Sequence, residues 1–298
     1  MTGLGGLIRR NIKLFFKDKG LFFTSLITPV ILLVLYATFL GKVYKDSFLS
    51  ASPELASLPG KLLDGLVGGQ LLSSLLAVSC VTVCFCSNML SVQDKVTGVR
   101  RDLTISPVSE TTLALGYYLA TEFSALIVCF SAAAVGFVYL AAVGWYLSVS
   151  DIFLILGDVV LITLFGTALS SVINCFLSSQ GQISAVGTIV SSGYGFISGA
   201  YMPISNFPVG LQKVVSFLPG TYGTSLLREH SLRGVFAELL SLGTPEEAVG
   251  EMKDAIDVNL YFFGSPVSIG AKYAVLTGCI LLFVLLFVLI SRKKRAKI

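Results

Sequence analysis

The sequence predicts an all-α integral membrane protein, and both its composition and its apolar segments support this class. Only 13% of the 298 residues are charged and 54% are hydrophobic, with a mean hydropathy of +0.85. Soluble domains carry about 25% charged residues. The apolar segments run almost uninterrupted for about 20 residues, which is the length of a membrane-spanning helix and about twice that of a barrel strand.

Six membrane spans are expected, each long enough to cross about 30 Å of hydrocarbon. They are residues 21–41, 63–90, 111–142, 150–178, 182–202 and 270–291. The first follows a basic stretch, as a signal peptide would, but its long apolar core and Pro29 favour a permanent span. Residues 1–298 are therefore predicted to form one transmembrane domain with a polar insertion at about 203–269.

The Lys and Arg residues predict the orientation. More than half of the 21 lie in 9–19, in 95–101 and in 292–297. Because cytoplasmic loops carry an excess of Lys and Arg, both termini and the loop between spans two and three are predicted to be cytoplasmic. The protein is therefore expected in the cell (plasma or inner) membrane, with the insertion outside. Basic residues at membrane edges argue against a nucleic-acid partner.

The N-terminal segment "LIRRNIKLFFKDKG" predicts a helix that lies in the plane of the lipid headgroups. Its apolar residues fall largely on one face and its basic residues on the other, so the lipid bilayer is its expected partner. The basic residues are Arg9, Arg10, Lys13 and Lys17.

The segment "SVQDKVTGVRRDLTISPVS", residues 91–109, is charged although its surroundings are apolar. Its apolar residues recur at spacings of four, three and four, which predicts one short amphipathic helix. These residues are Val92, Val96, Val99 and Leu103. Such a helix could dock on a soluble partner or lie on lipid headgroups, and the residues leave both open.

The outer insertion begins with "MPISNFPVGLQKVVSFLPGTYG", in which prolines flank an apolar helical pattern. This pattern predicts a short helix that dips back into the outer leaflet. The remainder predicts two amphipathic helices separated near Gly243-Thr244-Pro245, with acidic residues on a solvated face. His230 has no second histidine or cysteine nearby, so it is predicted to be a surface residue rather than a metal ligand.

Span five carries small and polar residues at helical spacing. Gly187, Ser191, Gly195 and Gly199 are each four apart, which allows another helix to pack closely. The same face could instead line a pathway, with Ser192 and Tyr194 as polar contacts. Both interpretations can hold at the seam of a dimer.

Two charges lie well inside spans, about two turns or more from the nearer end. Glu122 in span three and Asp158 in span four could contact a cationic substrate or carry a proton, or could hydrogen-bond to a neighbouring helix. The six cysteines all fall in apolar segments, which argues against a disulfide-stapled outer domain and favours packing roles. They are Cys80, Cys84, Cys86, Cys129, Cys175 and Cys279.

The chain contains no phosphate-binding G-x-x-x-x-G-K-[ST] motif and no hydrolase or metalloprotease motif, so it is not expected to be an enzyme. The whole layout resembles the type-2 ABC permease family, the membrane subunits of exporters that have a separate ATPase. Two segments carry the resemblance most specifically. They are "DKVTGVRRDLTISPV" between spans two and three and "SGAYMPISNFPVGLQKVVSFLPGTYG" after span five.

The resemblance implies that the loop at 91–109 is a coupling helix seated in a cleft of the ATPase. The matching contact positions are Asp94, Lys95, Gly98, Arg100, Arg101 and Asp102, and Ser106-Pro107 would end the helix. It also implies two permease copies, as a homodimer or a heterodimer, and two ATPase subunits that hold ATP and Mg²⁺, with no cofactor on this chain. Spans one, two and five would border the pathway. Val96 and Val99 stand where many members carry charge.

The expected function is export of an amphipathic or hydrophobic substrate such as a drug, a peptide antibiotic or a lipid-like molecule. Lipid-linked glycans and sodium also fall within the range of this family. The alternative is a standalone ion- or proton-coupled carrier that uses Glu122 and Asp158. A membrane-embedded enzyme is disfavoured because no catalytic cluster is present.

Overall fold

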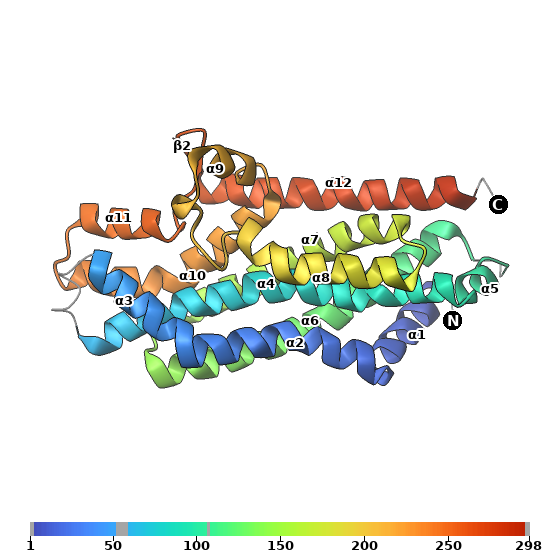
Figure 1. Ribbon diagram of the computed structural model, residues 1–298, viewed down its shortest axis with the longest axis horizontal. Coiled ribbons are helices and arrows are strands. Elements are labelled where there is room, and N and C mark those ends of the chain that lie inside the picture. The colour runs from blue at the N-terminus through green and yellow to red at the C-terminus, as the bar shows by residue number, and fades with distance from the viewer. Residues whose placement is uncertain (1–2, 52–58, 106–107, 296–298) are drawn as a thin grey trace.

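The computed structural model describes residues 3–51, 59–105 and 108–295, which form an elongated bundle of long helices (Figure 1). Both ends of the chain lie at the same end of the bundle, next to the short helix α5. That this end of the bundle faces the cytoplasmic side of the membrane stays a prediction.

Helices account for almost all of the fold. The N-terminal half contains α1 (Gly3–Lys17), α2 (Lys19–Leu35), a π-helical turn (Tyr36–Leu40), α3 (Gly41–Ala51), α4 (Gly60–Val96), α5 (Val99–Ile105) and α6 (Glu110–Val143). The C-terminal half contains α7 (Val149–Phe176), α8 (Gln180–Ile197), a 3₁₀ turn (Ile204–Asn206), α9 (Val209–Val215), α10 (Pro219–Ser241), α11 (Glu246–Ala255), an antiparallel hairpin of β1 (Tyr261–Phe262) and β2 (Ser265–Pro266), and α12 (Ile269–Arg295).

Serine side chains begin three of the long helices. Ser109 caps α6 by accepting a hydrogen bond from the backbone N–H of Thr112. Ser148 and Ser179 begin α7 and α8 with reciprocal capping boxes, in which the third helical residue bonds back to the cap. These contacts satisfy backbone N–H groups that lack a partner within the helix, and so they fix where each helix starts.

The membrane class is confirmed, whereas the count of six spans stays a prediction. Among the described residues, α4, α6, α7 and α12 are long and apolar enough to cross a membrane. The pair α1 and α2 would be a fifth span, bent by 74° at their junction. Helix α8, which corresponds to the predicted span 182–202, does not pass this test of length and hydropathy.

Helix α4 lies at the centre of the bundle and α12 at its periphery. Of the apolar window of α4, 94% is buried inside the protein, whereas only 17% is buried for α12. Helices α2, α6, α7, α8 and α10 all pack against α4. The largely apolar surface of α12 is therefore the kind that lipid covers, and α4 is the helix on which most of the others pack.

The insertion after α8 differs from the prediction. The predicted break near Gly243 is confirmed, since α10 ends at Ser241 and Gly243 adopts a φ of +89°. The Pro-bounded segment forms α9, whose Val209 and Val214 side chains are exposed. That α9 dips into the outer leaflet stays a prediction. It is α10 that enters the bundle, where it packs against α4, α7 and α12. The prediction of a surface His230 is wrong, because its side chain is buried within this packing.

Glycine permits the closest of these contacts, where α10 crosses the loop after α6. A Cβ atom on Gly234 would collide with the backbone oxygen of Tyr146, and a backbone atom cannot rotate away. We expect Gly234→Ala to lower the free energy of unfolding by about 1–3 kcal/mol, the usual cost of overpacking.

The control is Gly250→Ala in α11, where a Cβ atom would meet nothing within 4 Å. Because Ala favours helix over Gly, this variant should be neutral or more stable by up to about 1 kcal/mol. Five of the six cysteines are buried, so thermal unfolding in detergent can be followed with a thiol-reactive dye. Equal midpoints for the two variants would contradict the packing described here.

Candidate functional site

The segment 91–105 forms two elements rather than the one short helix that was predicted. Helix α4 continues to Val96, and α5 begins only at Val99. Between them Gly98 adopts a φ of +84°, which L side chains rarely adopt and glycine tolerates. The periodic valines did not reveal this break, because Val92 belongs to the buried face of the long helix α4.

Asp94 and Lys95 make contacts inside the protein. Asp94 is only 5% exposed and accepts hydrogen bonds from Arg10 of α1 at 2.8 Å and from the Tyr117 hydroxyl of α6 at 2.6 Å. The Lys95 ammonium group donates to the backbone oxygens of Asn174 and Leu177 at the end of α7. These two residues therefore attach the end of α4 to its neighbours. The other predicted coupling residues are the ones left to contact an ATPase.

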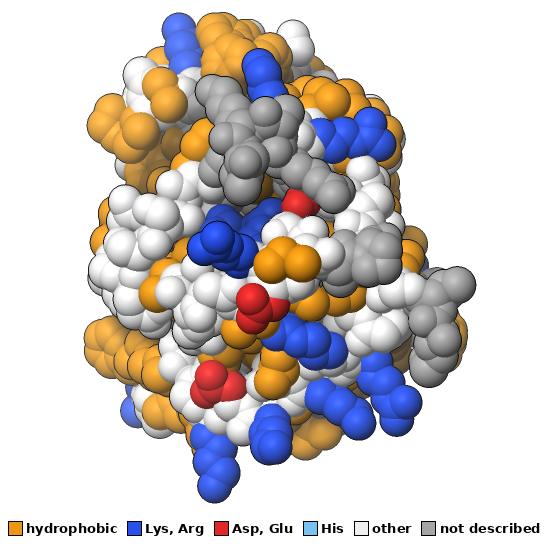
Figure 2. All heavy atoms as spheres, turned by 90° about the vertical axis from the view of Figure 1, so that its right-hand side faces the viewer, with side chains coloured by type: hydrophobic (Ala, Val, Ile, Leu, Met, Phe, Trp, Pro, Cys, Tyr) orange, Lys and Arg blue, Asp and Glu red, His pale blue; other side chains and the backbone are white. Residues whose placement is uncertain are grey.

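Helix α5 presents the remaining predicted coupling residues. Arg100 lies 3.7 Å from Glu110 at the start of α6, while Arg101 and Asp102 are exposed. Gly98 is also exposed. The predicted helix end at Ser106-Pro107 lies outside the described residues. Figure 2 shows this end of the molecule, where basic side chains outnumber acidic ones across the face.

The basic residues of α1 divide between surface and interior. Arg9, Lys13 and Lys17 are exposed, as the prediction of an interfacial helix requires. Arg10 instead turns inward to Asp94. The apolar face of α1 packs on α6, with Leu7 and Phe15 buried. Helix α1 is thus attached to the bundle by packing and by one ion pair.

A groove of about 670 Å³ runs between α2, α4 and α8. Gly187, Ser191 and Ser192 of α8 line it, and a Cβ atom on Gly187 would crowd the Met89 side chain of α4. The other lining residues are Asp18, Gly20, Leu21, Thr24, Ile27, Thr28, Ile31, Leu32, Cys86, Met89, Gln93, Gln180, Ser184, Thr188 and Tyr201. Asp18 is the one charged residue among them, so the lining mixes hydroxyl and aliphatic groups.

The other predicted residues of α8 serve packing. Gly195 lies against the ring of Tyr201, and the Tyr194 hydroxyl lies close to Gly220 of α10. Gly199 has a φ of +72° in the turn that ends α8. Helix α8 thus lines the groove as far as Ser192, and its last turns pack against α10 and the following loop.

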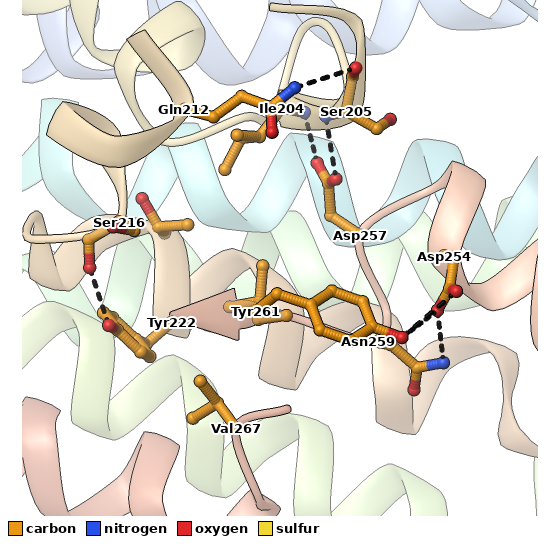
Figure 3. A pocket seen from close by; sticks show the side chains of 12 residues that line it. Ile204, Ser205, Gln212, Ser216, Tyr222, Asp254, Asp257, Asn259, Tyr261 and Val267 are labelled. Carbon is orange, nitrogen blue, oxygen red and sulfur yellow. Dashed lines mark hydrogen bonds between the residues drawn. The ribbon is translucent and has the colours of Figure 1, made fainter. Parts of the chain in front are cut away.

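A buried ion pair between α10 and the segment after α11 fixes the loop that follows α8. The Arg228 side chain is completely buried and donates to the Asp257 carboxylate at 3.2 Å and to the backbone oxygen of Gly199. Asp257 also accepts from the backbone N–H groups of Ile204 and Ser205, at 2.6 and 3.3 Å (Figure 3). Burial raises the pKa of the Asp257 carboxyl, against the opposing effects of Arg228 and of the two N–H groups.

Two further contacts hold this end of the groove. With its amide oxygen facing Arg228, Gln70 of α4 accepts from the guanidinium at 3.2 and 3.3 Å. The Tyr44 hydroxyl of α3 donates to the backbone oxygen of Tyr201, which itself lines the groove. The sequence interpretation missed Arg228 and Asp257 because both lie in a stretch predicted to be a solvated helix.

The two predicted intramembrane charges are enclosed by helices and do not line the groove. Glu122 of α6 accepts from the hydroxyls of Thr163 and Thr167 of α7, at 2.9 and 2.8 Å. Asp158 of α7 is completely buried; its carboxylate lies 2.6 Å from His230 Nδ1 and accepts from the Tyr273 hydroxyl at 2.7 Å. Their contacts link α6, α7, α10 and α12 to one another.

The resemblance placed span one, which contains most of α2, at the border of the pathway, but no residue of it was named. Thr24 and Thr28 stand four residues apart in an otherwise apolar segment, and both line the groove. That spacing places them on one helix face, and it was the signal that could have identified this face as polar.

Comparison with known protein families gives one match over most of the chain. A family model described as ABC-2 type transporter matches residues 2–230. This range contains α1 to α9, the groove, α5 and the first part of α10. A comparison with curated proteins gives no match.

Proposed function

The chain belongs to the ABC-2 type transporter family, and from this premise we propose that it is the permease subunit of an exporter driven by a separate ATP-binding cassette ATPase. In this proposal residues 1–298 form one transmembrane domain with six spans, α8 being the fifth. Both termini and α5 are cytoplasmic, and residues 203–269 lie at the outer side of the cell membrane. ATP and Mg²⁺ are held by the partner subunit.

The groove between α2, α4 and α8 is the observation that carries this proposal. Its lining alternates aliphatic side chains such as Ile27 and Ile31 with hydroxyl groups such as Thr24 and Ser184. Such a surface suits an amphipathic or hydrophobic substrate, for example a drug, a peptide antibiotic or a lipid-like molecule, better than a simple ion. Lipid-linked glycans or sodium are the alternatives within the family.

A second copy of the permease would complete the pathway. The groove is open along one side of a single chain, and exposed apolar residues flank it on α2 and α8, including Phe23, Val34 and Ile189. Two copies facing each other would cover these side chains and enclose the groove. A homodimer is the simplest arrangement, since one surface then meets itself, and a heterodimer with a related permease is the other.

Helix α5 would pass the motion of the ATPase to the groove. It continues from α4, which lines the groove, through Gly98, and Arg100 ties it to the start of α6. A displacement of α5 by closure of the ATPase dimer would therefore act on two helices of the bundle. Arg101 and Asp102 are exposed for this contact.

The standalone carrier is the weaker proposal. A proton- or ion-coupled carrier would need Glu122 or Asp158 to reach the pathway, yet neither residue lines the groove. Each carboxylate also has two side-chain partners within the bundle. These contacts support a role in helix association for both residues.

The test is purification of the tagged chain from its native cells in mild detergent. We expect an ATPase with a phosphate-binding loop to co-elute in about equal amount. Exchanging the two exposed charges of α5 with Arg101→Glu/Asp102→Lys keeps the net charge but inverts the pattern, and should reduce the co-eluting ATPase by about tenfold or more.

The control exchanges two charges at the opposite end of the bundle, Lys213→Glu/Glu246→Lys, and should leave the amount of ATPase unchanged. Absence of any such ATPase under gentle extraction would contradict the exporter proposal. If the control lost the ATPase as strongly as the α5 variant, α5 would not be the coupling element.

A further inference from the structure

A second large cavity lies behind α5, at the ends of several long helices. It has a volume of about 520 Å³ and is separate from the groove, with which it shares no lining residue. Helix α5 forms one wall, and the ends of α4, α7 and α12 form the others. The lining residues are Lys95, Arg100, Arg101, Thr104, Glu110, Cys175, Phe176, Leu177, Ser178 and Ser291.

The polar part of this cavity is basic. Lys95, Arg100 and Arg101 contribute three positive charges, and Glu110, close to Arg100, is the single acid among the lining residues. Arg101 has no acidic partner within the described part of the chain. Thr104, Ser178 and Ser291 add hydroxyl groups to the lining of the same cavity. Two arginines with nearby hydroxyl donors form a set that suits phosphate oxygens, which guanidinium groups bind in pairs.

The other part of the cavity is apolar and lies where the membrane helices end. Phe176, the last residue of α7, is 64% exposed, and Leu177 continues this wall. On α12 the candidate span extends to Lys293, so Ser291, like Phe176, lies near the end of a membrane helix. A basic pocket beside an exposed apolar wall, at the ends of spanning helices, lies at the level of the lipid headgroups.

We propose that this cavity binds an anionic phospholipid, with its phosphate group at Arg100 and Arg101 and its acyl chains along Phe176. Basic pockets between membrane helices are the usual sites for anionic headgroups. The assignment of the lipid to the cytoplasmic leaflet rests on the orientation in the proposed function. The bound lipid would touch α5 directly, so the lipid composition of that leaflet would influence the position of the coupling helix.

An acidic side chain of the ATPase is the competing occupant. Two observations favour the lipid. The cavity walls are the ends of α4, α7 and α12, so it lies between α5 and the membrane helices. Its wall also includes Phe176 at the end of a membrane helix, and an exposed aromatic ring suits an acyl chain better than a carboxylate.

The test is native mass spectrometry of the full chain, purified in mild detergent and delipidated. Phosphatidylglycerol and phosphatidylcholine with the same acyl chains are titrated separately, and inorganic phosphate is added as a competitor. We expect phosphatidylglycerol to bind at least tenfold more tightly. Arg101→Gln should weaken its binding by about fivefold, and Arg100→Gln/Arg101→Gln by about 25-fold, since each basic residue near an anionic surface contributes about this factor.

The matched control is Lys13→Gln/Lys17→Gln, which removes the same charge from exposed positions of α1 outside the cavity. It should change phosphatidylglycerol binding less than twofold. Arg101 is exposed, so its single replacement keeps the test valid if the double variant fails to fold. The chain is measured without an ATPase, so failure of the exporter proposal would not affect the result.

Four results would overturn the inference. Equal binding of the two lipids would remove the role of charge. An equal loss of binding in the α1 control would assign it to the general basic surface of this end. Complete competition by millimolar inorganic phosphate would identify a site for free phosphate rather than for a lipid. If the arginine variants bind phosphatidylglycerol as tightly as the native chain but lose the co-eluting ATPase, the cavity would be a site for the ATPase.

Discussion

Replacing Arg228 with methionine is expected to lower the free energy of unfolding by about 3–5 kcal/mol, because it leaves a buried carboxylate without its positive partner. The Arg228 side chain has no exposed surface, and its contacts reach three separate segments: Asp257, the backbone oxygen of Gly199 and, in the bonded orientation, Gln70. Methionine fills a similar volume, so the lost contacts rather than a cavity account for the effect.

Two companion variants separate the ion pair from general damage. Adding Asp257→Asn to Arg228→Met removes the uncompensated charge and should recover part of the loss. Asparagine also tolerates the φ of +55° at this position. The control Lys45→Met breaks the pair of Lys45 with Asp64, whose side chains are both 39% exposed, and should cost about 0–1 kcal/mol.

The readout is unfolding followed by thiol labelling in detergent. A similar loss in the Lys45 and Arg228 variants would show that burial adds nothing to the Arg228 pair. If the Arg228 variant alone is strongly destabilised, the loop after α8, at the Tyr201 end of the groove, is held chiefly by this one side chain.

Replacing Asp158 with leucine should lower the free energy of unfolding by about 2–5 kcal/mol. The carboxylate is completely buried between His230 and the Tyr273 hydroxyl, and leucine can accept no hydrogen bond from either. Each buried polar group that loses its partner costs about 1–3 kcal/mol. Because α7, α10 and α12 meet at this carboxylate, the loss should appear as a lower unfolding temperature for the whole bundle.

Asp158→Asn is the matched variant, since it keeps the shape and one acceptor oxygen. It should cost less than half as much as Asp158→Leu, and ATP-driven transport by the complex should continue. Asp158→Asn that folds as well as the native chain but stops transport would contradict a structural role. That outcome would favour the carrier alternative, in which the charge itself is required.

Hydrophobic periodicity predicted some elements of this fold and missed others. Apolar runs predicted the long helices, and Gly243 with Pro245 predicted the break after α10. Each of these depends on residues close together in the chain. The break at Gly98 was missed because the valines before it continue the pattern of α4, and only the packing of that helix shows where it ends.

For the candidate site too, the sequence predicted where the charged loop lies but not which of its residues are buried. The charges of 91–109 were sufficient to mark this loop, yet Asp94 is satisfied by Arg10, a residue 84 positions away. The pattern places an apolar face on a helix, but it does not say which helix covers that face. Asp94 and Lys95 could not be distinguished from the exposed Arg101 and Asp102 by composition.

The sequence by itself determined the membrane class, the approximate ranges of the long apolar helices and the family, because hydropathy and the two motifs are properties of local segments. Only the tertiary structure decided that α10 enters the bundle, that His230 faces Asp158, and that Arg228 faces Asp257. A charged or polar residue can leave water when a partner reaches it inside the protein. Whether a partner does so depends on how distant helices cross, and no local pattern contains that information.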